Sequence, residues 1–203
     1  MKSKSFKNRF VILKDVIETI KTRRCVREFK EDAVSDEDIK FLIDCARYAP
    51  SGFNIQPWSF LVIKNKDSLL KLSESGKKAM ILILESMKNT SKKASDFLVF
   101  LKTKGTSLFY NAPVLVIIFG NKNAPTVDFD CAMAAQNMML AAHSKGIGSC
   151  WIGGLQPALM DEKILKEIGA PQGYKAVAPL IFGYPRGRTP TPEKKEPEVK
   201  WLI

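Results

Sequence analysis

Metal ligands are scarce in this sequence of 203 residues. It has a single histidine, and its four cysteines form no C-x-x-C pair, so a zinc site would need ligands gathered from across the chain. We therefore predict no metal site and expect reduced, mostly structural thiols. The histidine is His143 and the cysteines are Cys25, Cys45, Cys131 and Cys150.

Long apolar runs and a cleavable leader are lacking too. No stretch approaches the roughly 18 consecutive apolar residues of a membrane span. Residues 1–15 carry cations but no long apolar core followed by a small-residue cleavage site. From these absences we expect a cytoplasmic protein with no membrane partner.

The common catalytic signatures are also missing. No G-x-G-x-x-G opens a βαβ unit, and neither a P-loop nor a G-x-S-x-G elbow is present. His143 falls near the C-terminus of a predicted helix, where the helix dipole favours it without a catalytic role. Because no acid, base and nucleophile are gathered, we predict no catalytic side chain. A cofactor with its own chemistry would explain that gap.

The composition is that of one domain spanning residues 1–203. With 45% hydrophobic and 26% charged residues, the chain can bury a core unaided. The net charge of +11, from 32 Lys and Arg against 21 Asp and Glu, permits binding to a polyanion. However, the lysines are dispersed over helices and both terminal segments, and no basic strip is interleaved with aromatic residues. No nucleic-acid partner is therefore expected.

Apolar spacing predicts an α+β domain in which helices outnumber strands. Ser35 followed by Asp38 resembles a capping box, the apolar run at 112–120 predicts a central strand covered on both faces, and Pro179 favours an edge or irregular position. The predicted helices are 14–22, 35–49, 67–87, one in 90–110 ending near Gly105, one from Thr126 or Asp128 to Gly146, and 157–168; the predicted strands are 58–64, 112–120, a short one in 146–151 and one in 175–185.

The stretch APSGFNIQPWSF at 49–60 is dense in special residues. Pro50 ends the preceding helix, and alternation in an extended chain puts Asn54 and Gln56 on one face, with their apolar neighbours on the other. A carboxamide both donates and accepts, so a pair of them matches a heterocycle edge that alternates C=O and N–H. The alternative is a loop whose amides satisfy nearby backbone groups.

Two further patterns suit a ligand that is anionic and flat. Arg23, Arg24 and Arg27 follow the first predicted helix, and in a helical or an extended backbone two guanidiniums can converge on one phosphate. A solvated helix end, stabilised by the helix dipole, is an equal alternative. Gly153 and Gly154 follow a predicted strand and would let backbone N–H groups approach a planar ligand, with a simple tight turn as the alternative.

The C-terminal segment 186–203 is rich in proline and charge and has too little apolar content for a core of its own. Its last residues, Trp201, Leu202 and Ile203, still need burial. We predict that this tail packs on a second subunit.

Four motifs, taken in order, resemble those of the nitroreductase family of FMN-dependent oxidoreductases. They are RRCVREF at 23–29, APSGFNIQPW at 49–58, GIGSCWIGG at 146–154 and FGYPRGR at 182–188. The resemblance covers nearly the whole chain. It implies an α+β sandwich, with a central, mostly antiparallel sheet flanked by helices, that forms an intertwined homodimer with FMN at the subunit interface.

The resemblance also implies which residues bind FMN. The three arginines near the first helix would hold the phosphate and ribityl end, and Cys25 stands where the family often has serine. Residues 50–56 would approach the flavin, in part from the partner subunit, and the glycine pair would offer N–H groups near flavin N5 and O4. Arg186 or Arg188 resembles the family's C-terminal phosphate contact. The implied set is Arg23, Arg24, Cys25, Arg27, Pro50, Ser51, Gly52, Asn54, Gln56, Trp151, Ile152, Gly153, Gly154, Arg186 and Arg188.

By the same resemblance, NADH or NADPH would give a hydride to flavin N5, and a nitroaromatic, quinone or flavin would then take the electrons in a ping-pong reaction. The first alternative is a deiodinase-like reductive dehalogenase of the same fold, with a lid formed by 90–110. The aromatic residues of that segment, Phe97, Phe100, Phe109 and Tyr110, are otherwise expected in the core. Flavin carriage without turnover and polyanion binding are further alternatives.

Overall fold

The computed structural model describes residues 15–87 and 91–202. Lys14, Thr90 and Ile203, at the ends of predicted segments, lie outside these residues. The helices are α1 (Val16–Thr22), α2 (Asp36–Ala46), α3 (Lys66–Ser86), α4 (Lys92–Lys102), α5 (Val127–Ser144) and α6 (Glu162–Glu167), with short 3₁₀ helices η1 (Gly52–Asn54), η2 (Gly153–Leu155) and η3 (Ala158–Met160). The strands are β1 (Trp58–Ile63), β2 (Val114–Asn121), β3 (Gly148–Trp151) and β4 (Tyr174–Gly183).

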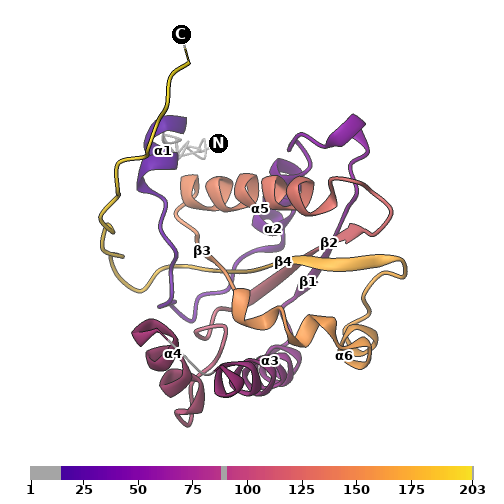
Figure 1. Cartoon of the computed structure of the whole chain (residues 1–203), viewed down its shortest axis with the longest axis vertical. Helices are drawn as coiled ribbons and strands as arrows, with labels where there is room; N and C mark the ends of the chain where they lie inside the picture. Colours follow the sequence, from indigo (N-terminus) through magenta and orange to yellow (C-terminus); the bar gives the residue numbers. More distant parts are fainter. Residues whose placement is uncertain (1–14, 88–90, 203) are drawn as a thin grey trace, which may run out of the picture.

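The described strands form one antiparallel sheet in the order β1-β2-β4-β3. Helices α2 and α5 cover one face of this sheet, and α3, α4 and α6 lie on the other side (Figure 1). Each face carries its own apolar core. The predicted α+β sandwich with a mostly antiparallel central sheet is confirmed.

Strand β2 is the centre of the sheet. Every side chain from 114 to 119 has 0% exposure, as predicted for a strand covered on both faces. The next residue, Gly120, is where the first turns of α5 come closest. A Cβ there would lie 2.1 Å from Val127 Cγ2 and 2.9 Å from Cys131 Sγ, so the missing side chain lets α5 lie flat on the sheet.

Local signals set most helix ends. Ser35 Oγ accepts the N–H of Asp38 at 3.0 Å and caps α2, as predicted. This helix ends at Ala46 rather than at 49, because the N–H groups of Tyr48 and Ala49 bond three residues back and wind the chain into a turn before Pro50. Helices α3, α4 and α5 follow their predicted segments. Within 15–87 and 91–202, no helix combines the length and the apolar character needed to cross a membrane.

Of the two positions predicted for Pro179, the edge strand is wrong, because β4 runs between β2 and β3. The irregular position is confirmed, since the β2–β4 register shifts between Ile118 and Phe119, next to the Ile117–Pro179 pair. The Pro179 carbonyl accepts the N–H of Ile152 at 2.8 Å. In an antiparallel strand the N and C=O of one residue point to the same neighbour, so the missing N–H faces β3. β3 ends at Trp151 and the chain then turns into η2, so little of the β-ladder is lost at this position.

Segment 157–168, predicted as one helix, is broken in two. Asp161 has φ −83° and ψ 118°, which separates η3 from α6. Its side chain accepts the N–H of Lys163 at 2.8 Å and so caps α6. Aspartate prefers such a cap to a mid-helix position, since its short carboxylate competes there for backbone N–H groups.

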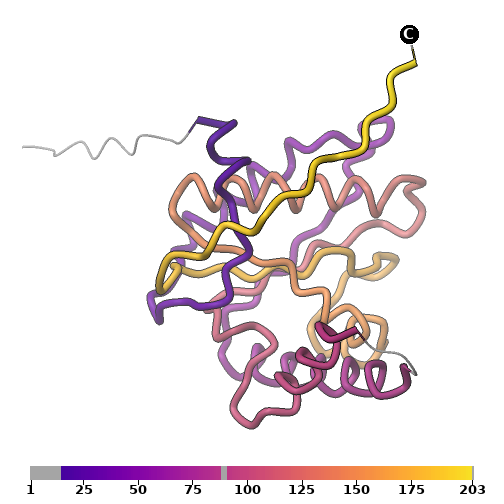
Figure 2. The backbone as a smooth tube through the Cα atoms, turned by 60° about the vertical axis from the view of Figure 1, so that its left-hand side comes forward, coloured from indigo at the N-terminus to yellow at the C-terminus, as the bar shows by residue number. Residues whose placement is uncertain are grey.

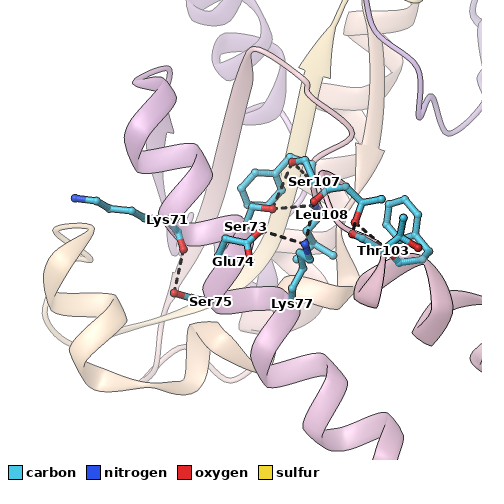
Figure 3. Close-up of polar contacts among 11 residues, drawn as sticks. Lys71, Ser73, Glu74, Ser75, Lys77, Thr103, Ser107 and Leu108 are labelled. Carbon is cyan, nitrogen blue, oxygen red and sulfur yellow. Dashed lines mark hydrogen bonds and ion pairs between the residues drawn. The ribbon is translucent and has the colours of Figure 1, made fainter.

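A polar cluster beneath α3 fixes the loop between α4 and β2 (Figure 3). Ser73, only 1% exposed, accepts the N–H of Leu108 at 2.8 Å and lies 3.4 Å from Ser107 Oγ. Lys77, also buried, donates to the Thr106 carbonyl at 3.0 Å and to a carboxylate of its own helix at 3.1 Å. A buried ammonium requires such partners. The loop that leads to Tyr110 is therefore held by α3.

We expect Ser73→Ala to lower the free energy of unfolding by about 1–3 kcal/mol, because the Leu108 N–H loses its acceptor. Ser75→Ala is the matched control, since its Oγ bonds only the Lys71 carbonyl one turn earlier on α3. We expect Ser75→Ala to change the free energy of unfolding by no more than about 0.5 kcal/mol. Urea unfolding followed by circular dichroism measures both, and equal losses in the two variants would contradict this anchoring role.

Candidate functional site

After α1 the chain becomes extended and joins the edge of β3. Arg23 has φ −58° and ψ 137°, Cys25 forms a parallel bridge with Ser149, and the Val26 N–H donates to the Ser149 carbonyl at 3.0 Å. A Cβ at Gly148 would lie 2.8 Å from Val26 Cγ2, so only glycine permits this approach. Of the two backbone forms left open for the arginine segment, the extended one is present.

A pocket of about 470 Å³ opens between this segment, the C-terminal end of α5 and the residues after β4. We call it the arginine pocket, because Arg23, Arg24 and Arg188 line it together. None of its lining residues is acidic. Guanidiniums gathered without a carboxylate favour a bound anion, above all one with the geometry of a phosphate.

Two polar atoms at this pocket are buried with no hydrogen-bond partner in the described structure, Ser149 Oγ and Arg24 Nε. The other nitrogens of Arg24 are occupied, with Nη1 donating to the carbonyls of Lys21 and Arg23 at 2.7 and 2.8 Å. Because buried polar groups are nearly always paired, these two atoms fit a site completed by a polar ligand. Sequence reasoning passed over Ser149, whose signal was a hydroxyl inside a short, buried strand.

His143 lies in the last turn of α5, as predicted, and lines the arginine pocket. Its Nε2 is 2.9 Å from Thr22 Oγ1, which in turn donates to the Glu18 carbonyl at 2.6 Å. This contact ties the end of α1 to the end of α5. The histidine therefore fixes one wall of the pocket.

A second pocket, of about 330 Å³, lies on the other side of β3. We call it the aromatic pocket, because Phe97, Tyr110 and Trp151 line it, together with Arg27 and the backbone that runs through Ile152 to Gly154. A Cβ built on Gly153 meets nothing within 4 Å. The backbone is thus open to the pocket, as a flat ligand would require.

The aromatic residues of 90–110 divide between core and pocket. Phe109 is 2% exposed and belongs to the core. Phe97 and Tyr110 line the aromatic pocket, and Phe100 stacks between them, with ring-centroid distances of 6.1 and 5.4 Å. One side of these three rings packs on the α3 core, as expected for core residues, whereas a lid formed by 90–110 stays a prediction.

Tyr110 occupies a strained backbone position in this wall. Its φ is 52° and that of Asn111 is 59°, left-handed values that cost little for asparagine but more for tyrosine. The Arg27 guanidinium lies 5.9 Å from the centroid of the Tyr110 ring. Burial raises the pKa of the Tyr110 hydroxyl. Strain of this kind persists where neighbours over-determine the conformation, which is common at ligand sites.

The expected extended chain at 51–56 is wrong. It contains η1, and Phe53, Asn54 and Gln56 have φ of 52°, 54° and 51°. The backbone turns because the N–H of Asn54 bonds the Ser51 carbonyl and that of Gln56 bonds Ser51 Oγ. The carboxamides nevertheless meet, since Gln56 Nε2 donates to Asn54 Oδ1 at 3.1 Å. We call residues 50–56 the carboxamide loop.

The carboxamide loop and the arginine pocket lie at opposite ends of α5. The Gly52 N–H donates to Asp130 in the first turn of this helix, whereas Thr22 contacts His143 in its last turn. At 1.5 Å per residue these contacts are roughly 20 Å apart. One chain therefore does not bring the two motifs together.

The two C-terminal arginines also separate. Arg188 lines the arginine pocket, whereas Arg186 lies with Arg27 in another cleft of about 470 Å³. Beyond them the tail crosses α1 and runs away from the body of the chain (Figure 2). Trp201 and Leu202 are 80% and 90% exposed, so their burial on a second subunit stays a prediction. In the parts of the chain that the structure describes, no three His, Cys, Asp or Glu residues are grouped for a metal ion.

Comparisons with known proteins agree with this geometry. The sequence profile of the Nitroreductase family matches residues 20–184. A solved nitroreductase with bound FMN from Bacteroides fragilis has a TM-score of 0.75 and 30% identity, over 94% of this chain and 98% of that one. The iodotyrosine deiodinase of Thermotoga neapolitana is 27% identical over 93% of this chain and 98% of its own. The FMN reductase (NADPH) of Bacillus subtilis is 26% identical over 85% of this chain and 67% of its own length.

We expect inorganic phosphate to stabilise the protein through the arginine pocket. Phosphate at ten times its Kd would add about 1.4 kcal/mol to the free energy of unfolding. Arg188→Ala should remove most of this gain, whereas Arg47→Ala, an exposed arginine paired with Asp44 on α2, should keep it. Urea unfolding in phosphate and in sodium chloride of equal ionic strength makes the comparison, and an undiminished gain in Arg188→Ala would count against the pocket.

Proposed function

The chain belongs to the nitroreductase family, and we propose that it is an FMN-dependent oxidoreductase that carries electrons from NADH or NADPH to an electrophilic small molecule such as a nitroaromatic, a quinone or a free flavin. The observation that carries the proposal is the arginine pocket, which is lined by three guanidiniums and by Ser149, and in which Arg24 Nε and Ser149 Oγ are buried without a partner among the described residues. The FMN bound by one relative and the NADPH named for another support it.

In this proposal the arginine pocket takes the phosphate end of FMN. Arg23, Arg24 and Arg188 would bind the phosphate, and Ser149 Oγ would pair with a polar atom of the ligand. The ring would lie toward the aromatic pocket, where Gly153 and the residues beside it present open backbone. The residues present fit FMN, because a cationic, a polar and a flat surface follow one another along β3.

Bound FMN would supply the redox chemistry, which is acceptance of a hydride from the nicotinamide and transfer of the electrons to the acceptor in a ping-pong cycle. The chain itself binds, orients and stabilises charge. Arg27 places a guanidinium at the wall of the aromatic pocket, and the backbone of Gly153 and Gly154 lines the same pocket. No side-chain acid or base is required, in keeping with His143 being engaged with Thr22.

We propose a homodimer in which the carboxamide loop of one copy completes the site of the other. The roughly 20 Å along α5 between the two motifs on one chain argues for a second copy. Apolar surface is also left to cover, since Val16, Ile17 and Ile20 of α1 are 61%, 52% and 52% exposed and Phe53 is 93% exposed. The exposed end of the tail adds to this surface.

We expect the change of Trp201 and Leu202 to serine to weaken the dimer and its retention of flavin, because both side chains are 80% or more exposed on one chain. The variant leaves Arg186 and Arg188 in place, which separates packing from phosphate binding. Changing Lys194 and Lys195 to alanine is the control. Light scattering after size-exclusion chromatography gives the mass, and a flavin-loaded dimer in the serine variant would show that the tail is dispensable.

A deiodinase-like reductive dehalogenase is the second candidate. The observation that favours it is the row of rings Phe97, Phe100 and Tyr110, which closes one side of the aromatic pocket. Turnover of one strongly preferred halogenated phenol would support a specialised site. A broad range of nitroaromatics and quinones would support the first candidate instead.

The deciding experiment is an anaerobic visible spectrum of the purified protein, recorded before and after addition of NADH or NADPH. Bound oxidised flavin that bleaches would support the proposed reductase and identify the donor. Bound flavin that stays oxidised with both nicotinamides would contradict it and favour a carrier or a dehalogenase. A protein that neither contains nor takes up FMN would overturn the proposal. Polyanion binding would then be the best explanation of its net positive charge.

A further inference from the structure

Two of the four cysteines meet between the proposed phosphate and ring sites. Cys25 is bridged to Ser149, the residue next to Cys150, and neighbouring strands lie about 4.8 Å apart. Both side chains pack in the same core cluster on the α3 face, and Cys150 Sγ lies 3.5 Å from the Trp151 carbonyl. The bridge brings the Cys25 backbone beside the residue that precedes Cys150, and a disulfide can join residues of strands at this spacing.

The surroundings favour a thiolate at Cys25. Arg23 Nη1 lies 3.9 Å from Cys25 Sγ, Arg27 adds a second positive charge, and Tyr110 also faces this group of residues. The hydrogen bond from Cys150, followed by the contacts with Arg23 and Arg27, lowers the pKa of Cys25 to about 5 against the opposing effect of burial. The same hydrogen bond and burial raise the pKa of Cys150. The two directions together favour a negative charge on Cys25 and a protonated thiol at Cys150.

The other two cysteines lack such surroundings. Burial raises the pKa of Cys131 to about 12, and that of Cys45 is raised by burial and by Asp44. Cys131 is a fully buried residue of α5 that faces the sheet, and its Sγ is 3.9 Å from the Phe119 carbonyl. The chain thus contains its own inert thiols for comparison.

We propose that Cys25 and Cys150 form a peroxide-sensitive modification site, in which Cys25 is oxidised and Cys150 converts the product to a disulfide. The Cys25 thiolate attacks one oxygen of a hydroperoxide, the O–O bond breaks, and a sulfenic acid forms while hydroxide leaves. The Cys150 sulfur then bonds to the Cys25 sulfur, and the S–H proton leaves with the sulfenic hydroxyl as water. The two sulfurs lose the two electrons that the peroxide gains.

The second step is helped by the first. While Cys25 is a thiolate, its charge keeps the proton on Cys150. The sulfenic acid is neutral, so this charge is gone and Cys150 ionises more readily when it must act as the nucleophile. The pair is thus a reactive thiol with a resolving partner, which a single cysteine at either position would not provide.

The disulfide has a consequence that rests on the proposed function. Cys25 lies between Arg23 and Arg27, and Cys150 lies between Ser149 and the glycine turn. A bond between the sulfurs ties the segment after α1 to β3 and so alters the strand edge that joins the two pockets. We expect the disulfide form to release FMN.

The test uses the purified full-length protein with its bound cofactor. One equivalent of hydrogen peroxide is added, the reaction is stopped with catalase, and the protein is unfolded in N-ethylmaleimide. Intact mass should fall from four labels to two, because two of the four cysteines are consumed. A peptide map should join Cys25 to Cys150. Four labels after peroxide, or a link that involves Cys45 or Cys131, would overturn the proposal.

Single variants separate the two steps. Cys150→Ala should leave a sulfenic acid at Cys25 that dimedone traps, whereas Cys25→Ser should give neither a dimedone adduct nor a disulfide. Cys45→Ser is the control and should form the disulfide as the parent does. If Cys150→Ala fails to fold, Cys150→Ser replaces it, and the peptide map of the parent protein decides the proposal without either.

The pH dependence of labelling is an independent prediction. With a pKa of about 5, Cys25 is already a thiolate at neutral pH, so its rate of alkylation by iodoacetamide should fall only as the pH is lowered through about 5. An ordinary thiol would continue to gain reactivity up to about pH 8.5. A Cys25 rate that still rises between pH 7 and 9 would contradict the stabilised thiolate.

The two proposals fail in different ways. The disulfide is read by mass, which does not depend on any flavin, whereas FMN release is read by absorbance of the ultrafiltrate after peroxide. A protein that forms the disulfide but never binds FMN would refute the proposed function alone. A flavin-loaded protein whose four thiols survive peroxide would refute the modification site alone.

Discussion

Burial of β2 on both faces is the constraint on which the rest of the structure depends. Its side chains from 114 to 119 are completely covered, so each face of the sheet needs its own layer of helices. Gly120 lets α5 approach closely enough to cover one face, and the α3 layer covers the other. Because the centre of the sheet is filled on both sides, open space for a ligand remains only at its margins.

The margin that matters is β3, a strand of four residues at the edge of the sheet. The segment after α1 joins it through one bridge at Cys25 and then departs, which leaves pockets on both sides of the strand. One pocket gathers guanidiniums, and the other gathers rings and bare backbone. A short edge strand thus separates a cationic surface from a flat one, and the interacting thiols of Cys25 and Cys150 lie at the boundary.

Helix α5 sets the distances between the parts of the site. Its last turn holds Thr22 through His143, and its first turns hold Gly52 through Asp130. A helix is rigid over this length, so the arginine pocket and the carboxamide loop stay far apart on one chain. The exposed apolar side chains of α1, the carboxamide loop and the tail lie at the parts of the molecule that a second copy would complete.

The sequence by itself determined the elements whose signals are local. The Ser35 cap, the apolar run of β2 and the order of the four motifs identified the α+β sandwich and its family, because capping, burial and motif spacing depend on neighbouring residues.

Tertiary structure decided what depends on distant partners. The turn of the carboxamide loop, the inner position of Pro179 and the break at Asp161 follow from hydrogen bonds that local alternation does not encode. Likewise, only the folded chain placed Arg188 with Arg23 and Arg24, left Ser149 Oγ without a partner among the described residues, and brought Cys25 beside Ser149 and thus near Cys150. These residues are far apart in sequence and meet only in the folded chain.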